Sequence, residues 1–119
     1  MKKPEIKWKR DLTFSRWIRN NLPDSQDGFL VTDLDFLLCN YKTKKIMLLE
    51  LKQRNTDIPE WQRKIFSNID RWIKKSIDDN WKYLGLHFIK FENIDFTDGK
   101  CYFDNKEITE KKLIEFLSF

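Results

Sequence analysis

The sequence predicts an α/β domain in which helices flank a mixed central sheet and a hairpin and a helix are added at the C-terminal end. Segments with apolar residues at helical spacing alternate with short apolar runs of extended character. The 119 residues, 40% of them aliphatic or aromatic, supply one hydrophobic core but not two. Because glycine and proline number only three each, we expect neither a linker nor repeats, and a single domain covering 1–119.

The first element is a predicted helix from about Leu12 to Asn21, with Asp11 placed to cap it. Phe14 and Trp17 share one face, and polar residues occupy the other. The following Leu-Pro-Asp sequence ends this helix.

Two extended runs follow. The stretch from Gly28 to Asn40 is rich in Phe, Leu and Val, and the stretch from Ile46 to Lys52 is almost wholly apolar. The polar residues Tyr41–Lys45 between them form a turn, so we expect the two runs to pair as antiparallel strands.

The principal helix is predicted from Glu60 to about Ile77, after a loop closed by Ile58-Pro59. Its apolar residues recur at helical spacing: Trp61, Ile65, Phe66, Ile69, Trp72 and Ile73. A further strand is expected from Tyr83 to Glu92, which completes the central sheet.

The C-terminal part is predicted to be a hairpin and a helix. Asp98-Gly99 has the composition of a two-residue turn, which would join Ile94–Thr97 to Lys100–Phe103. Thr109 is placed to cap the last helix.

The charge balance permits nucleic-acid binding without requiring it. Lys and Arg number 23 against 19 Asp and Glu, for a net charge of +4 and a pI of about 9.0. Several of the basic residues crowd the N-terminus, among them Lys2, Lys3, Lys7, Lys9 and Arg10. The same charges also serve a second role, which is to keep the surface soluble.

Two cysteines, Cys39 and Cys101, do not make a disulfide framework, and no signal peptide is recognisable. The longest apolar run, Ile46–Leu49, is too short to span a bilayer. We therefore expect reduced thiols, no membrane association and a cytoplasmic location, or the host cytoplasm if the genome is viral.

Several classes of chemistry lack the residues that they need. His87 is the only histidine, so the sequence offers almost no residues for a histidine-based zinc site or a Ser-His-Asp triad. No glycine-rich phosphate loop is present, which excludes an NTPase.

Charged residues gather instead at the ends of the two predicted strands. Because side chains alternate along a strand, Glu50 and Lys52 share one face, and Asp33 and Asp35 share a face of the preceding strand. Burying a charged group costs on the order of several kcal/mol unless the group is paired or binds a metal. One interpretation is a solvated rim with a Glu50–Lys52 or Asp35–Lys52 ion pair. The other is a carboxylate site for Mg²⁺ or Mn²⁺, in which Lys52 orients or deprotonates the attacking water.

Asp35, followed after fourteen residues by Glu50-Leu51-Lys52, resembles the D-x(n)-E-x-K signature of the PD-(D/E)XK nuclease superfamily, which includes restriction enzymes, Holliday-junction resolvases and RecB-type exonucleases. The resemblance covers about residues 12–92 and implies a restriction-endonuclease-like core. It also implies a Mg²⁺-dependent nuclease, with Mn²⁺ as a substitute, that hydrolyses phosphodiester bonds in DNA.

Carried to this chain, the resemblance makes Asp35 and Glu50 metal ligands, the Leu51 carbonyl a further ligand and Lys52 the catalytic lysine. Asp33 competes with Asp35 for the first position and is kept as a second candidate ligand. The proline of the family name is absent, since Leu34 precedes Asp35.

Gln62 is the next candidate, because it lies within the apolar arc of the principal helix, where an amide without a partner costs about 1 to 3 kcal/mol. Gln62-Arg63-Lys64-Ile65-Phe66 resembles the Q-x-x-x-Y element of RecB-type nucleases, with Phe in place of Tyr. The resemblance implies an active-site role for Gln62, and the alternative is a core glutamine bonded to the main chain.

Arg16, Arg63 and Lys64 are the candidate nucleic-acid contacts, with solvated surface positions as the alternative. The expected partner is DNA, and a homodimer is considered because many small nucleases dimerise to cut two strands. The alternative function is a catalytically inactive nucleic-acid-binding or protein-binding domain with a nuclease-like fold.

Overall fold

The computed structural model describes residues 12–119 and divides into two units, the first ending at Thr32 and the second running from Asp33 to Phe119. The first unit contains helix α1 (Thr13–Asn21) and a short 3-10 turn, η1 (Ser25–Asp27), whose cap Asp24 accepts the N–H of Gln26. The helix agrees with the predicted one. The predicted cap Asp11 and the basic N-terminal cluster lie outside the described residues.

The second unit is built on a five-stranded sheet whose strands follow the order of the chain. The strands are β1 (Phe36–Asn40), β2 (Lys45–Lys52), β3 (Lys82–Phe91), β4 (Cys101–Phe103) and β5 (Lys106–Ile108). Only the β2–β3 pairing is parallel, and the other three are antiparallel. The prediction of an α/β fold with a mixed sheet is thus confirmed.

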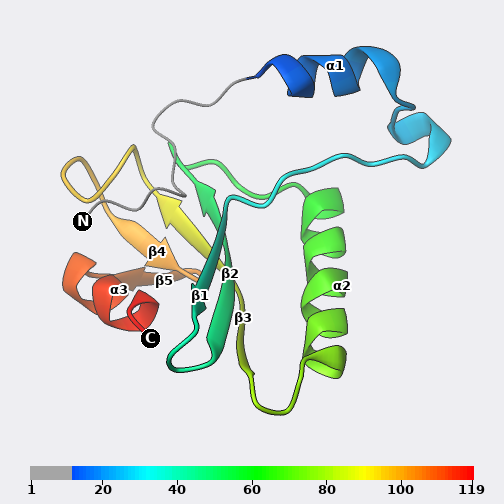
Figure 1. Cartoon of the computed structure of the whole chain (residues 1–119). Coiled ribbons are helices and arrows are strands. Elements are labelled where there is room, and N and C mark those ends of the chain that lie inside the picture. The colour runs from blue at the N-terminus through cyan, green and yellow to red at the C-terminus, as the bar shows by residue number, and fades with distance from the viewer. Residues whose placement is uncertain (1–11) are drawn as a thin grey trace. The chain divides into compact units, whose positions relative to one another are not determined.

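Helices α2 (Glu60–Ser76) and α3 (Glu110–Leu117) lie on opposite sides of this sheet (Figure 1). On the side of α3, Leu113 closes a core with Leu49, Ile89 and Cys101. Strand alternation sends Leu48 and Glu50 to the other side, where α2 packs against β3. In the part of the chain described, none of the helices has the length and apolar character needed to cross a membrane.

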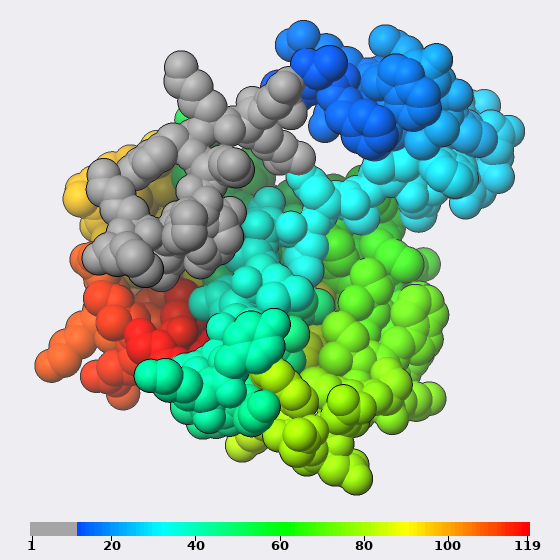
Figure 2. All heavy atoms as spheres, in the orientation of Figure 1, coloured from blue at the N-terminus to red at the C-terminus, as the bar shows by residue number. Residues whose placement is uncertain are grey.

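Strand β1 is one edge of the sheet and is shorter than the predicted extended run from Gly28. Its pairing with β2 begins at Phe36–Leu49. One step earlier, the Asp35 side chain takes the N–H of Leu51, which leaves that N–H unavailable to a continuing ladder. Asp35 therefore lies immediately before the strand and not within it. Figure 2 shows the β1–β2 hairpin at the surface, as the 61% exposure of Leu37 requires.

The predicted hairpin at Asp98-Gly99 was wrong. The Asp98 carboxylate accepts the N–H groups of Ile94 and Asp95, which closes a loop there instead of a two-residue turn. The hairpin is formed by β4 and β5, joined by Asp104 and Asn105 at φ values of 50° and 69°. Two consecutive left-handed residues make the turn type that matches strand twist.

Candidate active site

The candidate site lies where β1 and β2 meet, and it is held by two reciprocal hydrogen bonds. The N–H of Asp35 donates to Oε1 of Glu50 at 3.1 Å. The N–H of Leu51 donates to Oδ2 of Asp35 at 2.9 Å. Because the hairpin register sets Phe36 opposite Leu49, Asp35 comes opposite Glu50, and the two carboxylates are brought together from positions fifteen residues apart.

Glu50 is buried, with only 3% of its surface exposed. Burial raises the pKa of its carboxyl group from 4.5 to about 7, and hydrogen bonding and charge repulsion from Asp35 act in the same direction. The N–H of Asp35 and the charge of Lys52 oppose the increase but do not cancel it. Near neutral pH the pair therefore holds a proton about half of the time, and a bound cation would replace that proton.

Lys52 lies on the same face of β2 as Glu50 and close enough for its charge to act on that carboxyl group. Its side chain lines a cavity of about 30 Å³, together with Arg63 of α2 and Lys90 of β3. A water molecule needs a cavity volume of at least about 10–15 Å³, so this cavity holds one or two water molecules. The lysine is thus beside both the carboxylates and a space for water.

The structure connects the other predicted site residues less directly with the two carboxylates and Lys52. Gln62 is buried on α2 with 6% exposure, as its position in the apolar arc predicted, but its role at the site stays a prediction. Arg63 lies over the ring of Phe88, with 5.7 Å from its guanidinium carbon to the ring centroid, and so reaches the cavity beside Lys52. Lys64 is exposed on α2 and does not line that cavity.

Arg16 and Asp33 also stay predictions. Arg16 belongs to α1 in the first unit. Asp33 is exposed in the segment before β1. Over residues 12–119, no group of three or more His, Cys, Asp and Glu side chains is arranged to hold a metal ion, so the three-carboxylate patch considered from the sequence is not formed.

The donors that the structure does assemble fit a hard cation. Two carboxylates that interact with one another, one with a raised pKa, present oxygen ligands of the kind that Mg²⁺ and Mn²⁺ prefer. Mg²⁺ is usually bound through only one or two carboxylates and keeps water in its remaining positions. Asp35 and Glu50 would supply these ligands, with the Leu51 carbonyl as the predicted third donor.

A protein of Archaeoglobus fulgidus, described only as uncharacterized, is 30% identical to this chain over 94 residues. The matched region is 78% of this chain but 62% of the archaeal protein, so the chain spans less than two thirds of this relative. No protein-family model matches the sequence. No solved structure matches it either.

Two residues next to the site were missed from the sequence. The β2–β3 and β3–β4 registers set Lys52 opposite Lys90 and Lys90 opposite Tyr102, so the three side chains form a row on one face of the sheet. The available signal was Lys90 itself, a charged residue in a mostly apolar part of its strand. Tyr102 could not be found, because its strand was expected to pair differently.

Proposed function

We propose that this chain is a metal-dependent nuclease that hydrolyses phosphodiester bonds, with DNA as the substrate. The observation that carries the proposal is the buried Glu50 carboxyl group facing the exposed carboxylate of Asp35, with Lys52 on the same strand face as Glu50. The sequence alternative, a solvated rim of strand-end charges, does not suit a glutamate that is 3% exposed.

The order of elements supports a restriction-endonuclease-like core for the same region. An antiparallel β1–β2 hairpin is followed by α2 and then by β3, which is parallel to β2. The carboxylates come from the hairpin and the buried Gln62 comes from α2, as the resemblance to PD-(D/E)XK nucleases implies.

Each side chain has a role that follows from its place. When bound, the divalent cation would polarise the scissile phosphate and make a water molecule more acidic. Asp35 and Glu50 would hold that cation, and through it they would fix the reacting phosphate relative to β2. Lys52 places a positive charge where it orients the attacking water and offsets charge on the phosphate. Arg63, from α2, contributes a second cation on the same side.

A cleavage assay on single-stranded, duplex and branched DNA, with Mg²⁺ and with Mn²⁺, tests the proposal. We expect Glu50→Gln and Lys52→Ala each to lower the cleavage rate by about 10²-fold or more, since each removes a group used in the reaction. Chelation of the metal is expected to abolish cleavage.

Glu115→Gln and Lys111→Ala are the matched controls, because both residues are exposed on α3, which lies on the opposite face of the sheet. Thermal unfolding of every variant shows whether the fold is kept. Full activity in a folded Glu50→Gln protein contradicts the proposal. DNA binding without metal-dependent cleavage supports the alternative, a nucleic-acid-binding domain that has the fold but not the reaction.

A further inference from the structure

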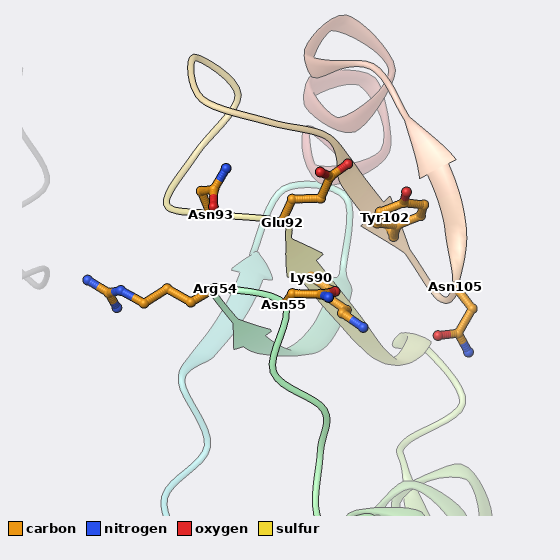
Figure 3. Close-up of a pocket in the computed structure, with 7 residues that line it drawn as sticks. All are labelled: Arg54, Asn55, Lys90, Glu92, Asn93, Tyr102 and Asn105. Carbon is orange, nitrogen blue, oxygen red and sulfur yellow. The ribbon is translucent and has the colours of Figure 1, made fainter.

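A large polar cavity lies beside the candidate active site in the second unit. Its volume is about 710 Å³, within the range of about 300–1,000 Å³ that is usual for ligand sites. Figure 3 shows its lining, which comes from the segment after β2, the end of β3 and the β4–β5 hairpin: Arg54, Asn55, Lys90, Glu92, Asn93, Tyr102 and Asn105.

This cavity adjoins the small cavity at Lys52, with which it shares two lining residues. Lys90 and Asn105 line both. In the sheet, Lys52, Lys90 and Tyr102 occupy neighbouring strands in register. Since strands are about 4.8 Å apart, Tyr102 lies about 10 Å from Lys52 along the row. A nucleic-acid strand whose scissile phosphate lies at Lys52 would therefore place a neighbouring nucleotide at Tyr102.

Most of the lining side chains are not engaged within the protein; the exceptions are Lys90 and Asn93, whose side-chain amide donates to the Asp98 carbonyl. Within residues 12–119, the side chains of Arg54, Asn55, Glu92, Tyr102 and Asn105 make no hydrogen bond, ion pair or ring contact with another side chain or with the main chain. Lys90 pairs with Asp57, at 2.8 Å, but that carboxylate is 82% exposed, and such a pair exchanges readily with another anion. The donors and acceptors of Arg54, Asn55, Glu92, Tyr102 and Asn105 are therefore available to a ligand.

The segment that carries Arg54 and Asn55 is held in an uncommon conformation. Both residues have a φ of 55°, a left-handed value that arginine seldom adopts. Two hydrogen bonds hold it there, from the N–H of Arg54 to the Asn93 carbonyl at 2.7 Å and from the N–H of Asn55 to the Phe91 carbonyl at 3.1 Å. This wall of the cavity is therefore set before a ligand arrives, at a cost in strain that is common at binding sites.

The chemical groups that line the cavity are of the kinds that bind the base and the phosphate of a single nucleotide. Tyr102 offers a ring that no other aromatic side chain of the described residues covers, and aromatic rings stack nucleobases. The amides of Asn55 and Asn105 can pair with the donors and acceptors of a base edge. In Figure 3 the Arg54 side chain extends away from the other labelled residues, where it would meet a phosphate of the strand outside the cavity.

We propose that this cavity binds an unpaired nucleotide of the substrate strand, next to the phosphate that is cut, with its base stacked on Tyr102. The inference rests on the proposed nuclease function for its substrate class. A base within a duplex is stacked and paired and does not enter a pocket without being unpaired first. The site thus favours single strands and overhangs over blunt duplex.

Binding measured without cleavage separates this inference from the nuclease proposal. The whole wild-type chain, in EDTA, is titrated by fluorescence anisotropy with a blunt DNA duplex, the same duplex carrying an unpaired overhang, and single strands of DNA and of RNA. We expect the overhang and the single strands to bind about tenfold more tightly than the blunt duplex, because one base gains a stacking contact with Tyr102. The DNA and RNA arms tell which sugar the cavity accepts.

Tyr102→Ala is expected to remove this preference, Tyr102→Phe to keep it because the ring is retained, and Arg54→Ala to weaken binding of the overhang. Tyr41→Ala and Lys111→Ala are the matched controls, since Tyr41 is 76% exposed in the β1–β2 turn and Lys111 is exposed on α3. If Tyr102→Ala does not fold, Tyr102→Leu and Arg54→Ala carry the test.

Each outcome bears on one proposal separately. A preference for unpaired nucleotides that depends on Tyr102 supports the pocket even where the wild-type chain cuts no DNA, in which case only the nuclease proposal fails. Equal affinity for blunt and overhanging duplex overturns the pocket, as does a folded Tyr102→Ala chain with wild-type preference, even where Mg²⁺-dependent cleavage is intact.

Discussion

Glu50 is a carboxyl group held where its charged form is poorly solvated. It is buried on β2 and faces a second carboxylate, that of Asp35. A protein that kept Glu50 for stability alone would be better served at this buried position by an apolar side chain of similar volume. A cation bound by the two carboxylates would replace the proton that Glu50 holds, and this would account for the arrangement.

Without metal, Glu50 should make the protein less stable as the pH rises. The unfolded chain releases this proton near pH 4.5 and the folded chain near pH 7, because burial raises the pKa. Between these values the folded state holds more protons, so the free energy of unfolding falls by about 3 kcal/mol in total as the pH increases.

Thermal unfolding in EDTA across this pH range measures the effect. Glu50→Gln carries no titrating proton, so the loss of stability that Glu50 causes should be absent from it, and it should be the more stable protein at pH 8. Identical pH profiles for the two proteins would show that Glu50 has an ordinary pKa.

At the element scale, α2 is fastened to β3 by Asp70. Its carboxylate accepts the Tyr83 hydroxyl at 2.8 Å and the Leu86 N–H at 3.0 Å, and it pairs with Lys74 at 2.9 Å. Burial opposes the charged form, but these partners outweigh it and lower the pKa of Asp70. This attachment sets the position of Gln62 and Arg63, which are on the same helix.

Asp70→Ala should lower the free energy of unfolding by about 2 kcal/mol or more, because it leaves the partly buried Tyr83 hydroxyl and Leu86 N–H without their acceptor. Since the folded-state pKa is lowered, the contribution of Asp70 is present above its ordinary value of 3.8 and is lost as the pH falls below it. Urea unfolding at pH 7 measures the change. Asp79→Ala, in the exposed loop after α2, is the control, and an equal loss in both variants would contradict this role.

The elements were predicted best where periodicity alone determines them. The principal helix, predicted from Glu60 to about Ile77, ends at Ser76, and Thr109 caps α3 by accepting the N–H of Lys112, as expected. The hairpin was missed because tertiary contacts select it. Asp104 accepts the Phe88 N–H and bonds Nδ1 of His87 at 2.6 Å, and these contacts fix β4 and β5 against β3. Asp98-Gly99 has the stronger local turn composition, but the Asp98 carboxylate bonds within its own loop, to the N–H groups of Ile94 and Asp95.

The candidate site shows the same division. Asp35, Glu50 and Lys52 were predicted from their spacing, since two adjacent strands and a period of two suffice to bring them together. The cavity beyond them was not, because it depends on the left-handed conformation of Arg54 and Asn55 and on the register that sets Tyr102 opposite Lys90. Neither feature has a signature in a single sequence.

At the scale of the whole molecule, the strands of the sheet, α2 and α3 all lie in the second unit, from Asp33 to Phe119. A fragment of residues 33–119 should therefore keep the native circular dichroism of the sheet and unfold cooperatively. Loss of cooperative unfolding would show that the first unit is needed for the fold. The same fragment tests Arg16, since a folded fragment with reduced DNA cleavage would support a phosphate contact in the first unit.

The central claim is that Asp35 and Glu50 form a site for a divalent cation, and a calorimetric titration with Mn²⁺ at pH 6 tests it most directly. At this pH, below the raised pKa of Glu50, the wild-type chain should bind the metal and release about one proton for each ion bound. Repeating the titration in buffers of different ionisation enthalpy counts the protons. Glu50→Gln should bind no Mn²⁺, whereas Glu115→Gln should bind as the wild type does. Failure of the wild-type chain to bind Mn²⁺, or equal binding by Glu50→Gln, would contradict the account.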